Sequence, residues 1–229
     1  MIIDLKNKII FIKTKKTAGT SMEIALSKFC GKACVITPIS PKDEVLRKRL
    51  GYRGPQNFYL ENFSTIKQKN INLFYNHISA NEVQKLIRPY LWDECKKIAI
   101  VRNPFDVAIS RYYWEGGDSL GLNFLQYLKN NPKHLRENAH ILSLKKGKVL
   151  DCYLRYENLE ADLRKNNLLH VWQVFKQIRA KSNIRPANGA TTEEMYRRFP
   201  SAIEIIIEEC YKEMKIFGYT PPSLQGQCL

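Results

Sequence analysis

The sequence predicts an α/β fold in which residues 1–229 form one three-layer domain around a mainly parallel central sheet. Short apolar runs, such as Lys8–Ile12 and Lys97–Val101, alternate along the chain with segments of helical periodicity. That alternation is typical of parallel strands joined by helices that cover both faces of the sheet. The length suits one domain with its own core, and no repeat or low-complexity tract divides the chain.

The strands are predicted from short apolar runs. Lys8–Ile12 is almost continuously apolar, which favours a central strand covered on both faces. Further runs predict strands at Val35–Thr37, Leu73–Tyr75, Lys97–Val101 and Val149–Arg155. Each of the last three ends in polar or charged residues, as expected where an open α/β sheet carries its functional groups.

The helices are predicted from start signals and apolar stripes. One helix follows the first strand and runs to about Lys28, and another begins at Ser79, where Glu82 completes a capping box. Pro104 begins a third. The clearest amphipathic helix is Pro200–Phe217. Its predicted apolar stripe consists of Ile203, Ile206, Ile207, Cys210, Met214 and Phe217.

The segment Ile9–Leu26 has the strand, loop and helix order of a phosphate-binding turn. Gly19 lets the backbone approach an anion, Thr20 and Ser21 stand where a helix begins, and several lysines add positive charge. Against the Walker A pattern only Gly19 and Ser21 match, so ordinary NTPase chemistry is not indicated. A second interpretation is open: Thr20 and Glu23 have the spacing of a capping box.

The net charge of +15 indicates attraction to a polyanion, which charge alone does not identify. The six cysteines include no CxxC pair, and Cys30 and Cys34 lack further ligands nearby in sequence, so reduced thiols and no metal site are expected. The first residues lack the features of a signal peptide, and no apolar run reaches membrane-spanning length. We therefore expect a cytoplasmic protein without a membrane span.

Two further turns carry candidate functional groups. The run KIAIV ends in Arg102, where an NTPase would have a metal-binding aspartate, and an arginine suits a fixed anion. The run Leu73–Tyr75 ends at Asn76 and His77. The basic residues Arg47–Arg49 have two interpretations, a solvated helix face or a substrate-binding surface.

These motifs together resemble those of sulfotransferases that use 3′-phosphoadenosine 5′-phosphosulfate (PAPS), in particular the carbohydrate branch with the heparan and chondroitin enzymes. That branch has a PKTAGTS-type loop, and Lys15–Ser21 reads KKTAGTS. Its second signature resembles Arg102–Trp114, which reads RNPFDVAISRYYW, and weaker matches occur at Arg155–Leu163 and Phe217–Tyr219. The chain departs from the family at Lys15, usually Pro, and at Lys13, often His.

The resemblance implies a P-loop-like, nucleotide-kinase-like fold and transfer of a sulfuryl group from PAPS to a hydroxyl, without a metal ion. Lys16 would stabilise charge on the leaving 5′-phosphate, and Arg102 and Ser110 would hold the 3′-phosphate. Lys181 or Arg185 would close over the nucleotide, unless that late loop is simply solvated. The implied cofactor-binding residues are Lys15, Thr17, Ala18, Gly19, Thr20, Ser21, Arg102, Ser110 and Arg185.

His77 is the predicted general base for the acceptor hydroxyl, because its ordinary pKa lies near neutrality and the resembling enzymes place a histidine after their middle strand. A packed or capping histidine is the alternative. The positive charge suggests an anionic or polar glycan as acceptor. Two other functions stay open: a P-loop kinase that uses ATP and Mg²⁺, and a basic nucleic-acid-binding module, for which no recognised motif is present.

Overall fold

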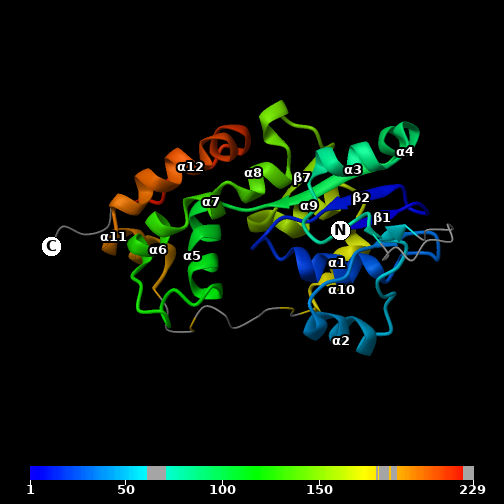
Figure 1. Ribbon diagram of the computed structural model, residues 1–229, viewed down its shortest axis with the longest axis horizontal. Coiled ribbons are helices and arrows are strands. Elements are labelled where there is room, and N and C mark those ends of the chain that lie inside the picture. Colours follow the sequence, from blue (N-terminus) through cyan, green and yellow to red (C-terminus); the bar gives the residue numbers. More distant parts are fainter. Residues whose placement is uncertain (61–70, 179, 181–185, 187–189, 224–229) are drawn as a thin grey trace. The chain divides into compact units, whose positions relative to one another are not determined.

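The computed structural model describes residues 1–60, 71–178, 180, 186 and 190–223 (Figure 1). The strands of this part of the chain are β1 (Ile2–Asp4), β2 (Ile9–Ile12), β3 (Val35–Ile36), β4 (Tyr59–Leu60), β5 (Ile71–Asn72), β6 (Lys96–Val101) and β7 (Cys152–Arg155). The helices are α1 (Gly19–Ser27), α2 (Pro41–Arg49), α3 (Ala80–Leu86), α4 (Pro89–Glu94), α5 (Pro104–Trp114), α6 (Phe124–Asn130), α7 (Pro132–Leu135), α8 (Glu137–Ile141), α9 (Leu159–Lys165), α10 (Leu169–Phe175), α11 (Thr192–Arg198) and α12 (Ser201–Phe217). Two short 3₁₀ helices are η1 (Leu144–Lys146) and η2 (Tyr156–Asn158).

The chain divides into two compact units. Unit 1 comprises Met1–Val101, Ile141–Ser143 and Val149–Ala180, and unit 2 comprises Arg102–His140, Leu144–Lys148 and Lys181–Leu229. Each unit consists of three separate segments of the chain. The sequence therefore contains no single linker whose composition would mark a domain boundary. The α/β class is confirmed, whereas a single domain over residues 1–229 remains a prediction.

The central sheet of unit 1 has the strand order β3-β1-β2-β6-β7. The expected parallel pairing holds for β2 with β6 and for β6 with β7, but β1 is antiparallel to both β2 and β3. The sheet is therefore mixed rather than mainly parallel. The sequence prediction missed β1, which forms a hairpin with β2. The Asp4 carboxylate closes that hairpin by accepting hydrogen bonds from the backbone N–H groups of Lys6 and Asn7.

Both faces of the sheet are covered, as the continuous burial of Ile9–Ile12 requires. In Figure 1, α1 and α10 lie together on one side of the sheet, and α3 and α4 lie on the other. The cluster on the α1 side includes Phe11, Ile24, Ile98 and Leu154. This packing holds α1 against the sheet.

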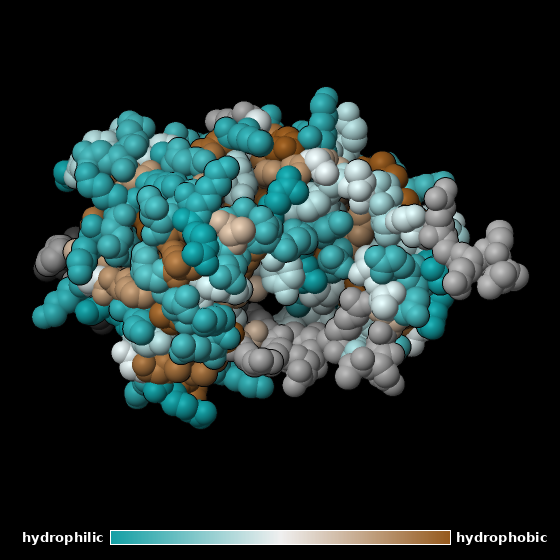
Figure 2. Space-filling model, turned by 180° about the vertical axis from the view of Figure 1, so that it is seen from behind, coloured by the Kyte–Doolittle hydropathy of each residue, from teal (hydrophilic) through white to brown (hydrophobic). Residues whose placement is uncertain are grey.

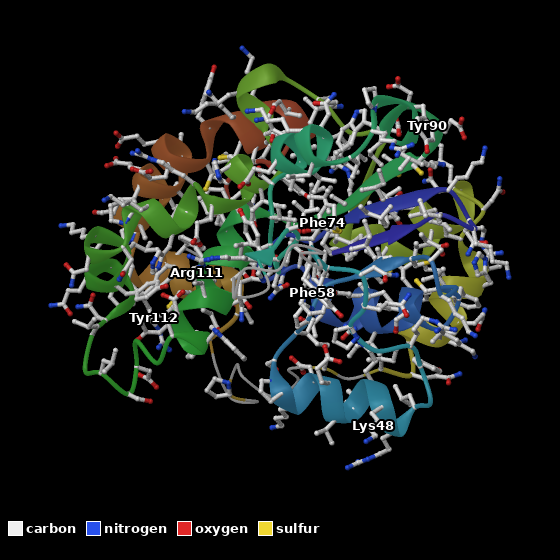
Figure 3. The ribbon with its side chains drawn as sticks, turned by 45° about the vertical axis from the view of Figure 1, so that its right-hand side comes forward. Lys48, Phe58, Phe74, Tyr90, Arg111 and Tyr112 are labelled. Carbon is white, nitrogen blue, oxygen red and sulfur yellow. The ribbon has the colours of Figure 1, made fainter. Side chains whose placement is uncertain are left out.

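Four of the five predicted strands are confirmed, and Leu73–Tyr75 is wrong. The strand of that region is β5, which pairs with β4 in a separate two-stranded sheet. β5 ends at Asn72, so Leu73–Tyr75 is not a strand. Just beyond it, the Phe74 N–H donates to the Phe58 carbonyl at 2.9 Å. Figure 3 shows these two phenylalanines near one another. His77 consequently lies in a turn, not at the end of a central strand.

Unit 2 is helical around an aromatic cluster that includes Phe105, Tyr112, Phe124 and Tyr196. Its α12 confirms the predicted amphipathic helix, but with a shifted buried face: Ile207 is 37% exposed, whereas Glu213 is buried.

Figure 2 shows mainly hydrophilic side chains on the face it displays, in keeping with the large net charge.

Candidate functional site: an anion loop and a held histidine

The loop between β2 and α1 has the backbone of an anion-binding turn. Lys16 and Ala18 both adopt left-handed conformations, with φ of 63° and 60°. Such conformations cost about 1–2 kcal/mol each in a non-glycine residue and are concentrated at functional sites. Ala18 is the N-cap of α1 and provides no side-chain hydrogen bond to the first turn. The N–H groups of that turn are therefore suited to an anionic ligand.

The capping-box interpretation of Thr20 and Glu23 is wrong. Both residues lie inside α1, and Glu23 is fully buried in ion pairs instead of reaching back to the helix start. Thr20 and Ser21 occupy the first turn and are also buried.

Gly19 is required by close packing. A Cβ atom at this position would lie 2.9 Å from Lys13 Cγ and 3.1 Å from the Thr14 carbonyl oxygen. Any other residue would displace either the start of α1 or the loop root.

Two threonines fasten the loop to the sheet. The Thr14 hydroxyl donates to the Ile100 carbonyl of β6 at 2.5 Å. Because that bond uses its proton, Thr14 accepts from Thr17 Oγ1, 2.7 Å away. The Thr17 side chain is fully buried in this contact, so only its backbone is suited to a ligand. Lys15 and Lys16 are half-buried beside it.

Lys13 does not add its charge to the loop surface, contrary to the sequence interpretation. It is 1% exposed, and its Nζ atom pairs with Glu23 Oε2 at 2.9 Å. The basic run on α2 is similarly split. Arg47 is fully buried, whereas Lys48 points outward from α2 in Figure 3.

His77 reaches the loop although it is not at a strand end. Its Nδ1 atom lies 3.0 Å from the Lys13 carbonyl oxygen, and its backbone is left-handed, with φ of 64°. Burial and the nearby Lys13 charge lower the pKa of His77 from 6.5 to about 4, so the ring is neutral at pH 7. Since a carbonyl oxygen only accepts, the ring proton is on Nδ1, and Nε2 keeps its lone pair.

Arg102 is the residue directly after β6, and Asn103 is the N-cap of α5. The Asn103 side chain accepts from the Phe105 N–H at 3.0 Å, which confirms the predicted helix start. Ser110 is half-buried in the same helix. Lys181 and Arg185 lie outside the described residues.

Cys30 and Cys34 have an unpredicted neighbour, because the hairpin brings Asp4 to within 4.8 Å of both sulfur atoms. Cys34 Sγ donates to Asp4 Oδ1 at 3.4 Å, and Cys30 Sγ donates to the Leu26 carbonyl. Burial raises the pKa of Cys30, which favours the protonated thiol. Both cysteines are thus thiols that donate hydrogen bonds. The sequence does not predict the contact with Asp4, because Asp4 is distant from both cysteines along the chain.

The structure is therefore that of an α/β protein in which a loop suited to an anion lies beside a neutral histidine. Comparison with family models gives a match to the family described as the sulfotransferase family, over residues 1–220. The chain belongs to the sulfotransferase family. No curated protein and no solved structure matches it. Among the residues described, no helix is long and apolar enough to cross a membrane.

Proposed function

We propose that the protein transfers the sulfuryl group of PAPS to a hydroxyl group of a polar or anionic glycan, in line and without a metal ion. The observation that carries the proposal is the double role of Lys13. It begins the anion loop that leads into the uncapped α1, and its carbonyl oxygen holds His77. A donor site and an acceptor base thus share one residue.

The loop fits the phosphosulfate end of the nucleotide. The left-handed residues Lys16 and Ala18 shape the loop, and Gly19 leaves room for the backbone. The proposal assigns the 5′-phosphate to the backbone of Lys15 through Gly19 and to the Thr20 and Ser21 hydroxyls, where the dipole of α1 is positive. PAPS would supply the activated sulfuryl group.

Each residue has a distinct task. Nε2 of His77 takes the proton of the acceptor hydroxyl as the hydroxyl oxygen bonds to sulfur, so that the anionic sulfate ester forms without a free alkoxide. Lys16 stabilises the negative charge that grows on the leaving phosphate oxygen as the S–O bond breaks. Arg102, with Ser110, would hold the 3′-phosphate, and Arg185 would close over the nucleotide.

The test is turnover of radiolabelled PAPS over a panel of glycans in the presence of a chelator. We expect labelled sulfate on at least one glycan and release of adenosine 3′,5′-bisphosphate. Binding of ATP with Mg²⁺, together with no binding of PAPS or adenosine 3′,5′-bisphosphate, would instead indicate a kinase. Salt-sensitive RNA binding without a saturable nucleotide site would indicate the nucleic-acid module. A cytoplasmic location stays a prediction.

A further inference from the structure

Glu23 of α1 is a fully buried carboxylate that connects four other segments of unit 1. Its Oε1 atom lies 3.1 Å from the Met1 amino nitrogen, accepts a hydrogen bond from the Thr37 hydroxyl at 3.2 Å, and lies 3.6 Å from Arg47. Its Oε2 atom lies 2.9 Å from Lys13 Nζ. Burial alone would raise the pKa of Glu23, but the surrounding cations outweigh it and lower the pKa from 4.5 to about 2. The carboxylate is therefore charged at every physiological pH.

Lys13 is where this buried cluster meets the site. Its side chain runs beneath Gly19, close enough that a Cβ atom there would touch Cγ at 2.9 Å and Cε at 3.7 Å. Its carbonyl oxygen accepts a hydrogen bond from His77 Nδ1, with the two heavy atoms 3.0 Å apart. A change in the position of Lys13 would therefore move two things together: the side chain that packs against Gly19 and the carbonyl oxygen that holds His77.

A buried ammonium group keeps its place only while its countercharge is present, because an uncompensated buried charge is strongly unfavourable. Glu23 supplies that countercharge from the helix whose first turn binds the proposed anion. We propose that Glu23 is a positioning residue for sulfuryl transfer, which through Lys13 holds the anion loop and His77 in their relative geometry. This role rests on the proposed function, but the geometry that it predicts can be measured without turnover.

The test compares Glu23→Gln, which keeps the shape of the side chain, with the control Glu94→Gln. Glu94 makes an ion pair with Lys8 at the other end of β2, at 3.0 Å, with both side chains largely exposed. The four quantities to compare are stability, kcat with PAPS, the Kd of adenosine 3′,5′-bisphosphate, and the ring ¹⁵N shifts of His77 in the free protein. A small misplacement of reacting groups costs on the order of 100-fold in rate.

For Glu23→Gln we expect kcat to fall on the order of 100-fold per folded molecule. The Kd of adenosine 3′,5′-bisphosphate should rise about tenfold, by analogy with metal sites, which lose affinity when a residue that orients a ligand is removed. The ¹⁵N shifts should change from a fixed Nδ1–H ring to a mixture of the two tautomers. Glu94→Gln should match the wild type in all four. A folded Glu23→Gln protein with native ¹⁵N shifts and kcat within about threefold of wild type would overturn the proposal, since a merely stabilising residue would change only the stability.

If Glu23→Gln does not fold, Lys13→Met decides, because it keeps the stem beneath Gly19 and leaves Glu23 its other partners. Loss of the His77 signature supports the proposal, and a native signature with native kcat contradicts it. Should the wild-type protein fail to use PAPS, the proposed function falls, while the His77 shifts still report whether Glu23 fixes the histidine.

Discussion

Replacing Lys16 by Ala should reduce turnover with PAPS by about 100- to 1000-fold, the effect of removing one preorganised donor to developing charge. Lys16 is held in a left-handed conformation in the loop that leads into α1. In the role we propose for it, the charge of Lys16 acts mainly in the transition state, where the leaving phosphate gains negative charge. We therefore expect kcat to fall far more than the affinity for adenosine 3′,5′-bisphosphate.

Steady-state kinetics with labelled PAPS and calorimetric binding separate the two effects. Lys6→Ala is the matched control, because Lys6 is an exposed lysine in the turn between β1 and β2. It should retain wild-type kinetics. Turnover of Lys16→Ala within a few-fold of wild type would show that the loop does not bind the reacting end of the donor.

Replacing Glu213 by Gln should stabilise the protein at alkaline pH by several kcal/mol. Glu213 lies on the buried face of α12 with Ile206, Cys210 and Phe217. Burial raises its pKa from 4.5 to about 8. Between these values the folded protein keeps a proton that the unfolded chain has lost, so rising pH favours unfolding by about 1.4 kcal/mol per pH unit. The loss begins above pH 4.5 and is complete above about pH 8.

Urea unfolding of wild type and variant at a series of pH values gives the difference curve. Glutamine has no titrating proton, so the variant should gain progressively between pH 4.5 and 8 and match the wild type below that window. Subtracting the wild-type curve from the variant curve removes contributions that both proteins share. One of these comes from the buried Met1 amine: burial lowers its pKa from 8.0 to about 5, so its contribution to stability rises with pH, opposite to that of Glu213. Glu204→Gln, exposed on the same helix, is the control. A flat difference curve would contradict this account of Glu213.

Local sequence patterns predicted the elements that frame the site. The continuous apolar runs at Ile9–Ile12 and Lys97–Val101 are sufficient to indicate covered strands, and Pro104 and the Asn103 side chain define the start of α5. The strand-to-helix order at Gly19 similarly indicated the anion loop. These signals are local because each depends on neighbours a few residues away.

The features that the sequence did not reveal depend on distant partners. Glu23 has the spacing of a capping residue, and only the folded chain brings Met1, Thr37 and Arg47 to it. His77 was expected near the loop for a reason that proved wrong: a turn, not a strand end, places it on Lys13. The short strand β1 was not predicted because its antiparallel pairing with β2 and β3 becomes visible only in the folded chain, and that pairing makes the sheet mixed.

The central proposal is that the α1 loop binds the 5′ end of one nucleotide and that Arg102 binds the 3′-phosphate of the same nucleotide. Calorimetric titration of wild type and Arg102→Ala with adenosine 3′,5′-bisphosphate and with adenosine 5′-phosphate tests it directly. In the wild type we expect the 3′-phosphate to strengthen binding by about 10- to 100-fold, as charge-assisted hydrogen bonds do. In Arg102→Ala that advantage should largely disappear while binding of adenosine 5′-phosphate is unchanged. An equal loss of affinity for both nucleotides, or none for either, would contradict the account.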